Sequence, residues 1–174
     1  MRRPIYQGRI VDLGIEDVTL PNGARVALEV IRHPGASAVV AVDAADAVVL
    51  IHQYRHAAGG YLWELPAGVL DHEGEAPESC AVRELREETG LVAGEMTPLG
   101  SILTTPGFTD ERIHLFLALH LREEAAERGE DEDIAEVARV PFADALARVR
   151  RGEIVDGKTI AGLHLAAARL GIGA

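Results

Sequence analysis

Cysteine is nearly absent from this chain of 174 residues, in which Cys80 is the only one. No disulfide can form within the chain, and a reducing cytoplasm is therefore its simplest expected location. Because no base partner for a nucleophile is evident, we interpret Cys80 as a small packing residue. Aromatic side chains are also scarce, at 4% of residues, so valine, leucine, isoleucine and alanine must fill the core.

Positive charge is in deficit, since the chain has a formal net charge of −11. An acidic surface repels polyphosphates, which argues against a general nucleic-acid-binding protein. A metal-dependent enzyme escapes this objection, because bound cations neutralise its site locally. Long apolar runs are missing too: Asp43 and Asp46 interrupt the most apolar stretch, and no apolar segment follows the basic start of the chain. We therefore expect neither a membrane span nor a signal peptide.

Hydrophobic periodicity and turn residues predict one α/β domain over residues 1–174, with a mixed sheet between helices and an N-terminal antiparallel hairpin unit. Asn22-Gly23 marks a hairpin turn, and two near-continuous apolar runs suit strands buried on both faces. The expected strands are Tyr6–Leu13, Glu16–Leu20, Arg25–Arg32, Ala36–Val42, Ala47–Gln53, Leu99–Thr104, Ile113–His120 and Ala135–Val140. The expected helices, each followed by a glycine that can end it, are Pro77–Thr89, Pro141–Arg151 and Lys158–Leu170.

The clearest chemical signal lies on the helix expected at Pro77–Thr89. An advance of about 100° per residue places Glu84, Glu87 and Glu88 within one arc of its surface. Like charges at these spacings each cost a helix about 0.2–0.5 kcal/mol, so helix stability alone would favour a mixture with lysines. Three clustered carboxylates instead form a hard, oxygen-rich site suited to magnesium or manganese, and Arg83 can orient them. A solvated acidic face is the simpler alternative, but the glycine-containing loop before the helix and the glycine after it favour the metal site.

The segment Gly68–Leu91 resembles the signature box of the Nudix hydrolases. That box reads Gly, five residues, Glu, seven residues, Arg-Glu, an aliphatic residue, any residue, Glu-Glu, any residue, Gly and an aliphatic residue. Every fixed position from Glu75 to Leu91 matches. Six residues instead of five separate Gly68 from Glu75, which indicates a one-residue insertion in the loop Leu70–Gly74.

The resemblance implies the α/β/α sandwich of that family and assigns roles within the box. Glu84 and Glu88 would be the principal metal ligands, with Glu87 assisting and the backbone carbonyl of Ala67 as a further ligand. Glu87 and Arg83 would also take part in catalysis. Glu75 would support the loop and Gly90 would end the helix.

Flanking motifs narrow the resemblance to the ADP-ribose pyrophosphatases. Arg55 is either a surface cation or, as the resemblance favours, a forked clamp for a phosphate. Glu64 is either a solvated loop residue or a group that helps to hold the substrate. Gly107 and Phe108 either form a plain turn or allow a close approach to a ligand. The motifs that carry this resemblance are Gln53–His56, Trp63–Gly68, Thr105–Glu111 and Gly157–Ala161, although Trp63 itself is interpreted as a core residue.

The acidic stretch Glu123–Asp133 has no periodicity and would ordinarily be a solvated loop. In the resembling pyrophosphatases, an acidic loop before the last strand supplies the general base. The pattern Glu-any-Glu-Asp-Ile favours Glu132 for that role, with Glu130 as the substitute.

The expected reaction is the metal-dependent hydrolysis of ADP-ribose to AMP and ribose 5-phosphate. The same box would also serve a sugar nucleotide, a dinucleoside polyphosphate or a flavin dinucleotide. A non-catalytic module that binds ADP-ribose is less favoured, because such relatives usually lose box glutamates that this chain keeps. The resemblance further implies a homodimer built with the N-terminal strands of residues 1–34. The acidic charge and the interrupted apolar stretches argue against nucleic-acid and membrane partners.

Overall fold

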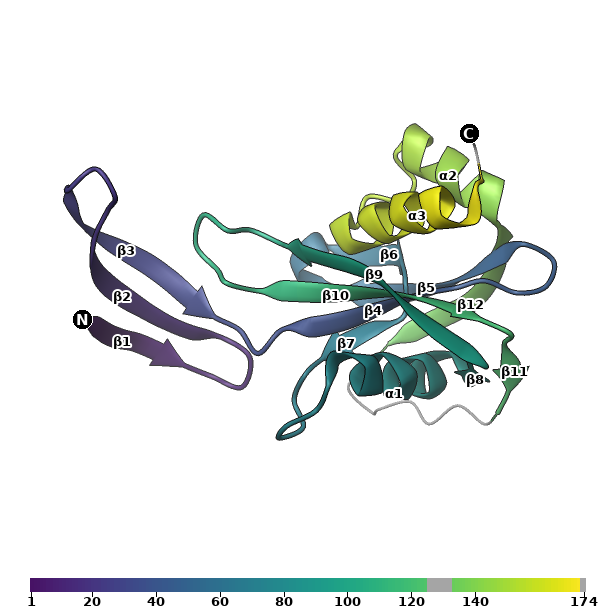
Figure 1. The fold of residues 1–174 in the computed structure, drawn as a ribbon, viewed down its shortest axis with the longest axis horizontal. Coiled ribbons are helices and arrows are strands. Elements are labelled where there is room, and N and C mark those ends of the chain that lie inside the picture. Colours follow the sequence, from purple (N-terminus) through teal and green to yellow (C-terminus); the bar gives the residue numbers. More distant parts are fainter. Residues whose placement is uncertain (125–132, 173–174) are drawn as a thin grey trace.

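The computed structural model describes residues 1–124 and 133–172. Figure 1 shows a layer of strands with α1 on one face and α2 and α3 on the other, and a separate N-terminal sheet that projects to one side. The strands are β1 (Arg2–Gln7), β2 (Asp12–Thr19), β3 (Arg25–Arg32), β4 (Ala36–Ala41), β5 (Ala47–Arg55), β6 (Gly60–Glu64), β7 (Ala67–Val69), β8 (Leu91–Val92), β9 (Glu95–Leu103), β10 (Arg112–Leu119), β11 (Arg122–Glu123) and β12 (Ile134–Pro141). The helices are α1 (Pro77–Thr89), α2 (Phe142–Arg151) and α3 (Gly157–Leu170), with a short 3-10 helix, η1 (His56–Ala58).

The central layer consists of two main sheets, with strand orders β7-β4-β10-β9 and β12-β5-β6. Strands β4 and β10 run parallel, from Ala36 beside Ile113 to Ala41 beside Ala118, and the other pairs in these sheets are antiparallel. The predicted mixed sheet is therefore confirmed, as is the sandwich of helices around it.

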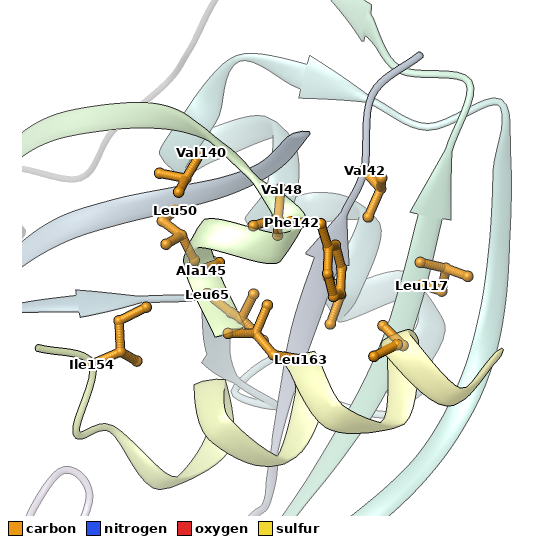
Figure 2. Packing of buried hydrophobic residues seen from close by; sticks show 13 residues of the cluster. Val42, Val48, Leu50, Leu65, Leu117, Val140, Phe142, Ala145, Ile154 and Leu163 are labelled. Atoms are coloured by element: carbon orange, nitrogen blue, oxygen red, sulfur yellow. The ribbon is translucent and has the colours of Figure 1, made fainter. Parts of the chain in front are cut away.

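The hydrophobic core has two halves, one on each side of the central layer. Alternate residues of β4 point to opposite faces, so that Val39 joins the α1 side and Val40 the α3 side. Figure 2 shows the α2–α3 side, where Phe142 and Leu163 pack among side chains of several strands. All residues of β4 are buried, which confirms the prediction of strands covered on both faces. Each large aliphatic or aromatic side chain buried in this way contributes about 1.5–3 kcal/mol.

Helix α3 lies very close to the sheet at Gly162. A Cβ at this position would stand 2.6 Å from Cδ1 of Leu65 and 3.1 Å from Cγ2 of Val40. A residue with a Cβ at this position would force the Leu65 side chain to shift, whereas glycine allows the approach as it stands. The contact fixes the start of α3 next to the segment between β6 and β7.

The N-terminal strand boundaries predicted from the sequence, Tyr6–Leu13 and Glu16–Leu20, are wrong. The structure instead has a turn where the first strand was expected to continue, because the backbone N–H of Gly8 donates to the carbonyl of Val11 at 2.8 Å. The apolar residues beside this turn alternate with polar ones as they would in a strand, so the sequence pattern predicted one continuous strand here. The predicted antiparallel unit is thus a three-stranded sheet, β1-β2-β3, which contains the hairpin of β2 and β3.

The remaining predicted elements are confirmed with small shifts at their ends. The Asn22-Gly23 turn joins β2 to β3, with Gly23 at a φ of 87°. Strand β9 begins at Glu95, four residues before the expected Leu99. The prediction placed the start too late because Pro98 interrupts the strand pattern in the sequence. No helix among the described residues is long and apolar enough to cross a membrane.

The N-terminal sheet is joined to the body by the loop between β9 and β10. The backbone N–H of Ile31 donates to the carbonyl of Phe108 at 2.8 Å. The Arg32 guanidinium contacts Asp110 at 2.8 Å and Glu16 at 2.6 Å. These contacts fix the direction in which the sheet leaves the body.

Candidate active site

A cleft of about 1110 Å³ opens where α1, β5, β7 and the start of α3 meet. One side of the cleft is lined by Ala67, Gly68, Arg83, Glu84 and Glu87. Another part of its wall includes Gln53, Arg55, Gly157 and Lys158. The turn between β1 and β2 also reaches this cleft with Arg9 and Ile10.

Helix α1 delivers the box carboxylates to the cleft, and its bounds follow from its sequence. Pro77 occupies the first turn, and Gly90 ends the helix in a left-handed conformation at a φ of 70°. Ala81 and Leu85 are buried against the sheet, as the helical pattern predicts. Their burial turns the carboxylates towards β7: Glu84 is 6% exposed and Glu88 is fully buried, whereas Glu87 is half-buried.

Arg83 connects the box carboxylates to the loop that precedes the helix. Its Nη1 donates to Oε1 of Glu84 at 2.6 Å and to Oε2 of Glu87 at 3.2 Å. Its Nε and Nη2 donate to the two carboxylate oxygens of Glu75 at 2.9 and 3.1 Å. The hydrogen bonds from Arg83 hold the pKa of Glu75 below its ordinary value despite partial burial. Arg83 therefore links Glu84 and Glu87 to Glu75 in the preceding loop through its hydrogen bonds.

Strand β7 approaches the box carboxylates with its backbone. The N–H of Ala67 donates to Oε2 of Glu88 at 2.8 Å. A Cβ on Gly68 would stand only 1.8 Å from Oε1 of Glu84, so a residue with a side chain would displace this carboxylate. The arrangement places the buried Glu84, the half-buried Glu87 and the β7 backbone in the wall of the cleft, whereas the fully buried Glu88 does not line the cleft and contacts the backbone N–H of Ala67. This set of hard oxygen donors fits a divalent cation such as magnesium or manganese.

A second group of potential metal ligands lies in the loop before α1, where ligand atoms of Asp71, His72 and Glu75 come within 4.8 Å of one another. Asp71 and His72 are exposed, and both carboxylate oxygens of Glu75 already accept hydrogen bonds from Arg83. Exposed carboxylates are well solvated, so this group makes a poorer case for a metal site than the carboxylates on α1.

The buried carboxylate of Glu64 holds two cations at the cleft. Nε and Nη2 of Arg55 donate to its two oxygens, each at 2.9 Å, and the ammonium group of Lys158 donates to Oε2. Burial opposes ionisation of Glu64, but Arg55 and Lys158 outweigh it and hold the pKa of the carboxyl below its ordinary value. Glu64 is 1% exposed, whereas the Arg55 side chain is 41% exposed. Glu64 therefore holds the side chains of Arg55 and Lys158 in place, and both of its carboxylate oxygens already accept hydrogen bonds from them.

Some predicted site residues are not gathered at this cleft. Gly107 and Phe108 do not line it; Phe108 is 52% exposed, and its carbonyl binds Ile31 in the N-terminal sheet. Glu130 and Glu132 lie outside the described residues. Sequence reasoning also missed Lys158 as an individual site residue, noting it only within a flanking motif.

Two structural interpretations of site-adjacent residues are confirmed. Trp63 is half-buried, packs against the α2–α3 core and stacks on His52 with ring centroids 4.5 Å apart. Cys80 is buried, and this burial raises the pKa of its thiol to about 11. The thiol is therefore protonated near neutral pH and is a packing group, as expected.

Comparisons with known proteins agree with this geometry. The NUDIX domain profile matches residues 31–162. The chain is 43% identical over 160 residues to an ADP-ribose pyrophosphatase of Bacillus subtilis, covering 91% of this chain and 85% of that protein. It is 38% identical to a GDP-mannose pyrophosphatase of Citrobacter koseri, covering 83% and 80% of the two chains. A crystal structure of an ADP compounds hydrolase superposes with a TM-score of 0.84 and 25% identity, over 99% of this chain and 94% of the other.

The buried Glu64 cluster predicts a specific effect of pH on stability. Because the folded-state pKa of Glu64 lies below the ordinary value of 4.5, its ionised pairs stabilise the fold above that pH. This contribution is lost as the pH falls through the folded-state pKa. Glu64→Gln should lower the free energy of unfolding by about 1–3 kcal/mol at pH 7, and the difference should shrink as the pH falls below the ordinary value of 4.5.

Urea unfolding at several pH values measures this difference. The matched control is Glu153→Gln, since Arg151 also lowers the pKa of Glu153 but both side chains are at the surface. Solvent screens such a pair, so the control should unfold much like the wild type. Parallel pH curves for Glu64→Gln and the wild type would contradict the prediction.

Proposed function

Because this chain belongs to the Nudix hydrolases, we propose that it hydrolyses the pyrophosphate bond of ADP-ribose to give AMP and ribose 5-phosphate. The observation that carries the proposal is the cleft itself, in which Glu84 and Glu87 of the box line one space with Arg55 and Lys158, the two cations that the buried Glu64 holds. The carboxylates suit a cation, and the forked guanidinium suits the phosphates that such a cation would accompany.

The box residues and the cations at the cleft would bind the metal and the substrate, respectively. Glu84 and Glu88, with Glu87 and the carbonyl of Ala67, would hold magnesium, or manganese in its place. A bound ion of this kind neutralises phosphate charge and lowers the pKa of a water ligand. Arg55 would bind the diphosphate, and Arg83 would keep the carboxylates in place.

The diphosphate is the part of the substrate that these residues would bind, so a sugar nucleotide is the second candidate. The similar GDP-mannose pyrophosphatase supports that alternative. ADP-ribose is favoured by the greater identity and coverage in the match to the ADP-ribose pyrophosphatase.

A substrate panel with and without metal tests the proposal. We expect hydrolysis of ADP-ribose in magnesium or manganese, with AMP and ribose 5-phosphate as products by chromatography, and no turnover in EDTA. A preference for GDP-mannose would mean that the substrate is a sugar nucleotide and not ADP-ribose. Full turnover in EDTA would contradict the metal site.

The box ligands are tested by substitutions that keep side-chain size. Glu84→Gln and Glu88→Gln should each reduce turnover by orders of magnitude while circular dichroism shows a folded protein. Glu78→Gln is the matched control, because Glu78 lies on the same helix but is exposed outside the cleft lining. Equal losses in all three variants would contradict a special role for the box.

The general base is proposed to be Glu132, with Glu130 as its substitute. The box glutamates would be engaged with metal, so a carboxylate outside the box is needed to accept a proton from the attacking water. Support comes from the sequence resemblance and from Asp133, which follows this stretch, lines the cleft and hydrogen-bonds Tyr61 at 2.9 Å.

Glu132→Gln keeps size and polarity but removes the proton-accepting charge. Turnover should fall by about 10²–10⁴-fold, the usual contribution of a general base. Metal affinity should change much less than in Glu84→Gln. If only Glu130→Gln loses turnover, the base is Glu130; activity in both variants would remove the acidic stretch from the mechanism.

We also propose a homodimer that is built through the N-terminal sheet. In this three-stranded sheet β1 and β3 are edge strands, and Ile5, Tyr6 and Leu28 are 51%, 60% and 42% exposed. Open edges and exposed apolar side chains favour coverage by another surface. Sedimentation should therefore show a dimer at micromolar concentration, and a monomer there would contradict the proposal.

A further inference from the structure

Lysine occurs only once in this chain. Of its seventeen basic residues, Lys158 alone is a lysine and the others are arginines. It is the second residue of α3, and its side chain is only 11% exposed. A chain that otherwise uses arginine thus places its single lysine side chain in a nearly buried position at the cleft.

The Lys158 ammonium bridges two carboxylates from different parts of the fold. It binds Oε2 of Glu64, at the end of β6, and stands 3.1 Å from Oδ2 of Asp156, which caps α3. Asp156 also accepts hydrogen bonds from the backbone N–H and hydroxyl of Thr159, at 2.9 and 2.6 Å. The Thr159 hydroxyl oxygen in turn accepts from the N–H of Leu65 at 2.8 Å. The start of α3 is therefore bound to two consecutive residues, Glu64 and Leu65.

This bridge determines how Arg55 meets the cleft. Arg55 uses Nε and Nη2 to bind Glu64, which leaves Nη1 on the edge of the guanidinium away from that carboxylate. A guanidinium is planar and rigid, so the orientation of the Glu64 carboxylate sets the direction of the remaining N–H groups. Because Lys158 and Asp156 restrain Glu64 on its other side, they indirectly restrain Arg55.

An ammonium group suits this bridge better than a guanidinium. It is a compact charge with three donors that can point to carboxylates in different directions, whereas a guanidinium pairs best with a carboxylate lying in its own plane. The Arg55 fork already occupies one lone-pair position on each oxygen of Glu64, so the second cation must use another position on Oε2.

We propose that Lys158 is a positioning residue, which holds Glu64 so that Arg55 presents its free edge to the diphosphate of the substrate. The inference rests on the proposed function, because it assumes that a diphosphate binds in this cleft. Lys158 also lines the cleft, and direct binding of the phosphates by its ammonium group is the competing explanation. The two explanations differ in whether Lys158 still matters when Arg55 is absent.

A double-mutant cycle separates them. We expect Lys158→Met to lower kcat/KM for ADP-ribose at least roughly tenfold, mainly through a higher KM, since a charged contact to the substrate is disturbed. In the Arg55→Ala background, Lys158→Met should cause less than about a twofold further loss, because its effect passes through Arg55. Equal losses in both backgrounds would mean that Lys158 touches the substrate itself and would overturn the proposal, as would full activity of Lys158→Met.

The control removes a cation from the same helix outside the cleft. Arg169 is exposed in the last turn of α3, and Arg169→Met should leave kcat/KM unchanged. Melting curves establish that each variant is folded at the assay temperature. If Lys158→Met does not fold, Lys158→Arg takes its place, because it keeps a positive charge but not the compact ammonium bridge.

The substrate assignment is tested separately by the wild-type protein. If ADP-ribose is not hydrolysed, the proposed function fails, and the same cycle is measured by calorimetric titration with ADP, which keeps the diphosphate but lacks the terminal ribose. A loss of ADP affinity that depends on Arg55 supports the positioning role, and a loss that persists without Arg55 refutes it.

Discussion

The burial of two carboxylates, Glu84 and Glu88, where α1 meets β7 is the constraint on which the site depends. A buried carboxylate left without partners destabilises a fold by several kcal/mol, so the surrounding chain must supply donors. The fold supplies Arg83 to Glu84 and the backbone N–H of Ala67 to Glu88. Gly68 has no side chain, and this allows the Glu84 carboxylate to lie against the β7 backbone. The box is therefore a unit of helix, strand and loop, and not only a strip of acidic residues on a helix.

The same principle operates a second time at Glu64. There a buried carboxylate orders cations, whereas the buried carboxylates on α1 are proposed to hold one. The Glu64 cluster joins β5, the end of β6 and the start of α3, and Gly162 allows α3 to lie close enough for this contact. Packing in the core thus determines the electrostatics of the cleft, because a shift of α3 would move Lys158 away from Glu64.

The loop between β9 and β10 has a different place in the fold from the one its sequence suggested. Its motif predicted that Gly107 and Phe108 bind substrate, but in the structure Phe108 contacts the N-terminal sheet through its backbone, and neither residue lines the cleft. The loop and the Arg32–Asp110 contact set the direction of that sheet, whose first turn reaches the cleft with Arg9 and Ile10. The loop is therefore connected to the site through the placement of another unit.

The sequence by itself determined the features that depend on local pattern. Proline and glycine set the bounds of α1, helical periodicity grouped its glutamates, and continuous apolar runs identified β4 and β5 as buried strands. Only the tertiary structure decided that Lys158 binds Glu64, 94 residues earlier in the chain. A single ion pair between distant residues leaves no periodic signal, because its geometry arises from the packing of α3 on the sheet. The turn after β1 was misjudged for a related reason: alternation of apolar residues shows that a segment can be extended, but hydrogen bonds to neighbouring strands decide where each strand ends.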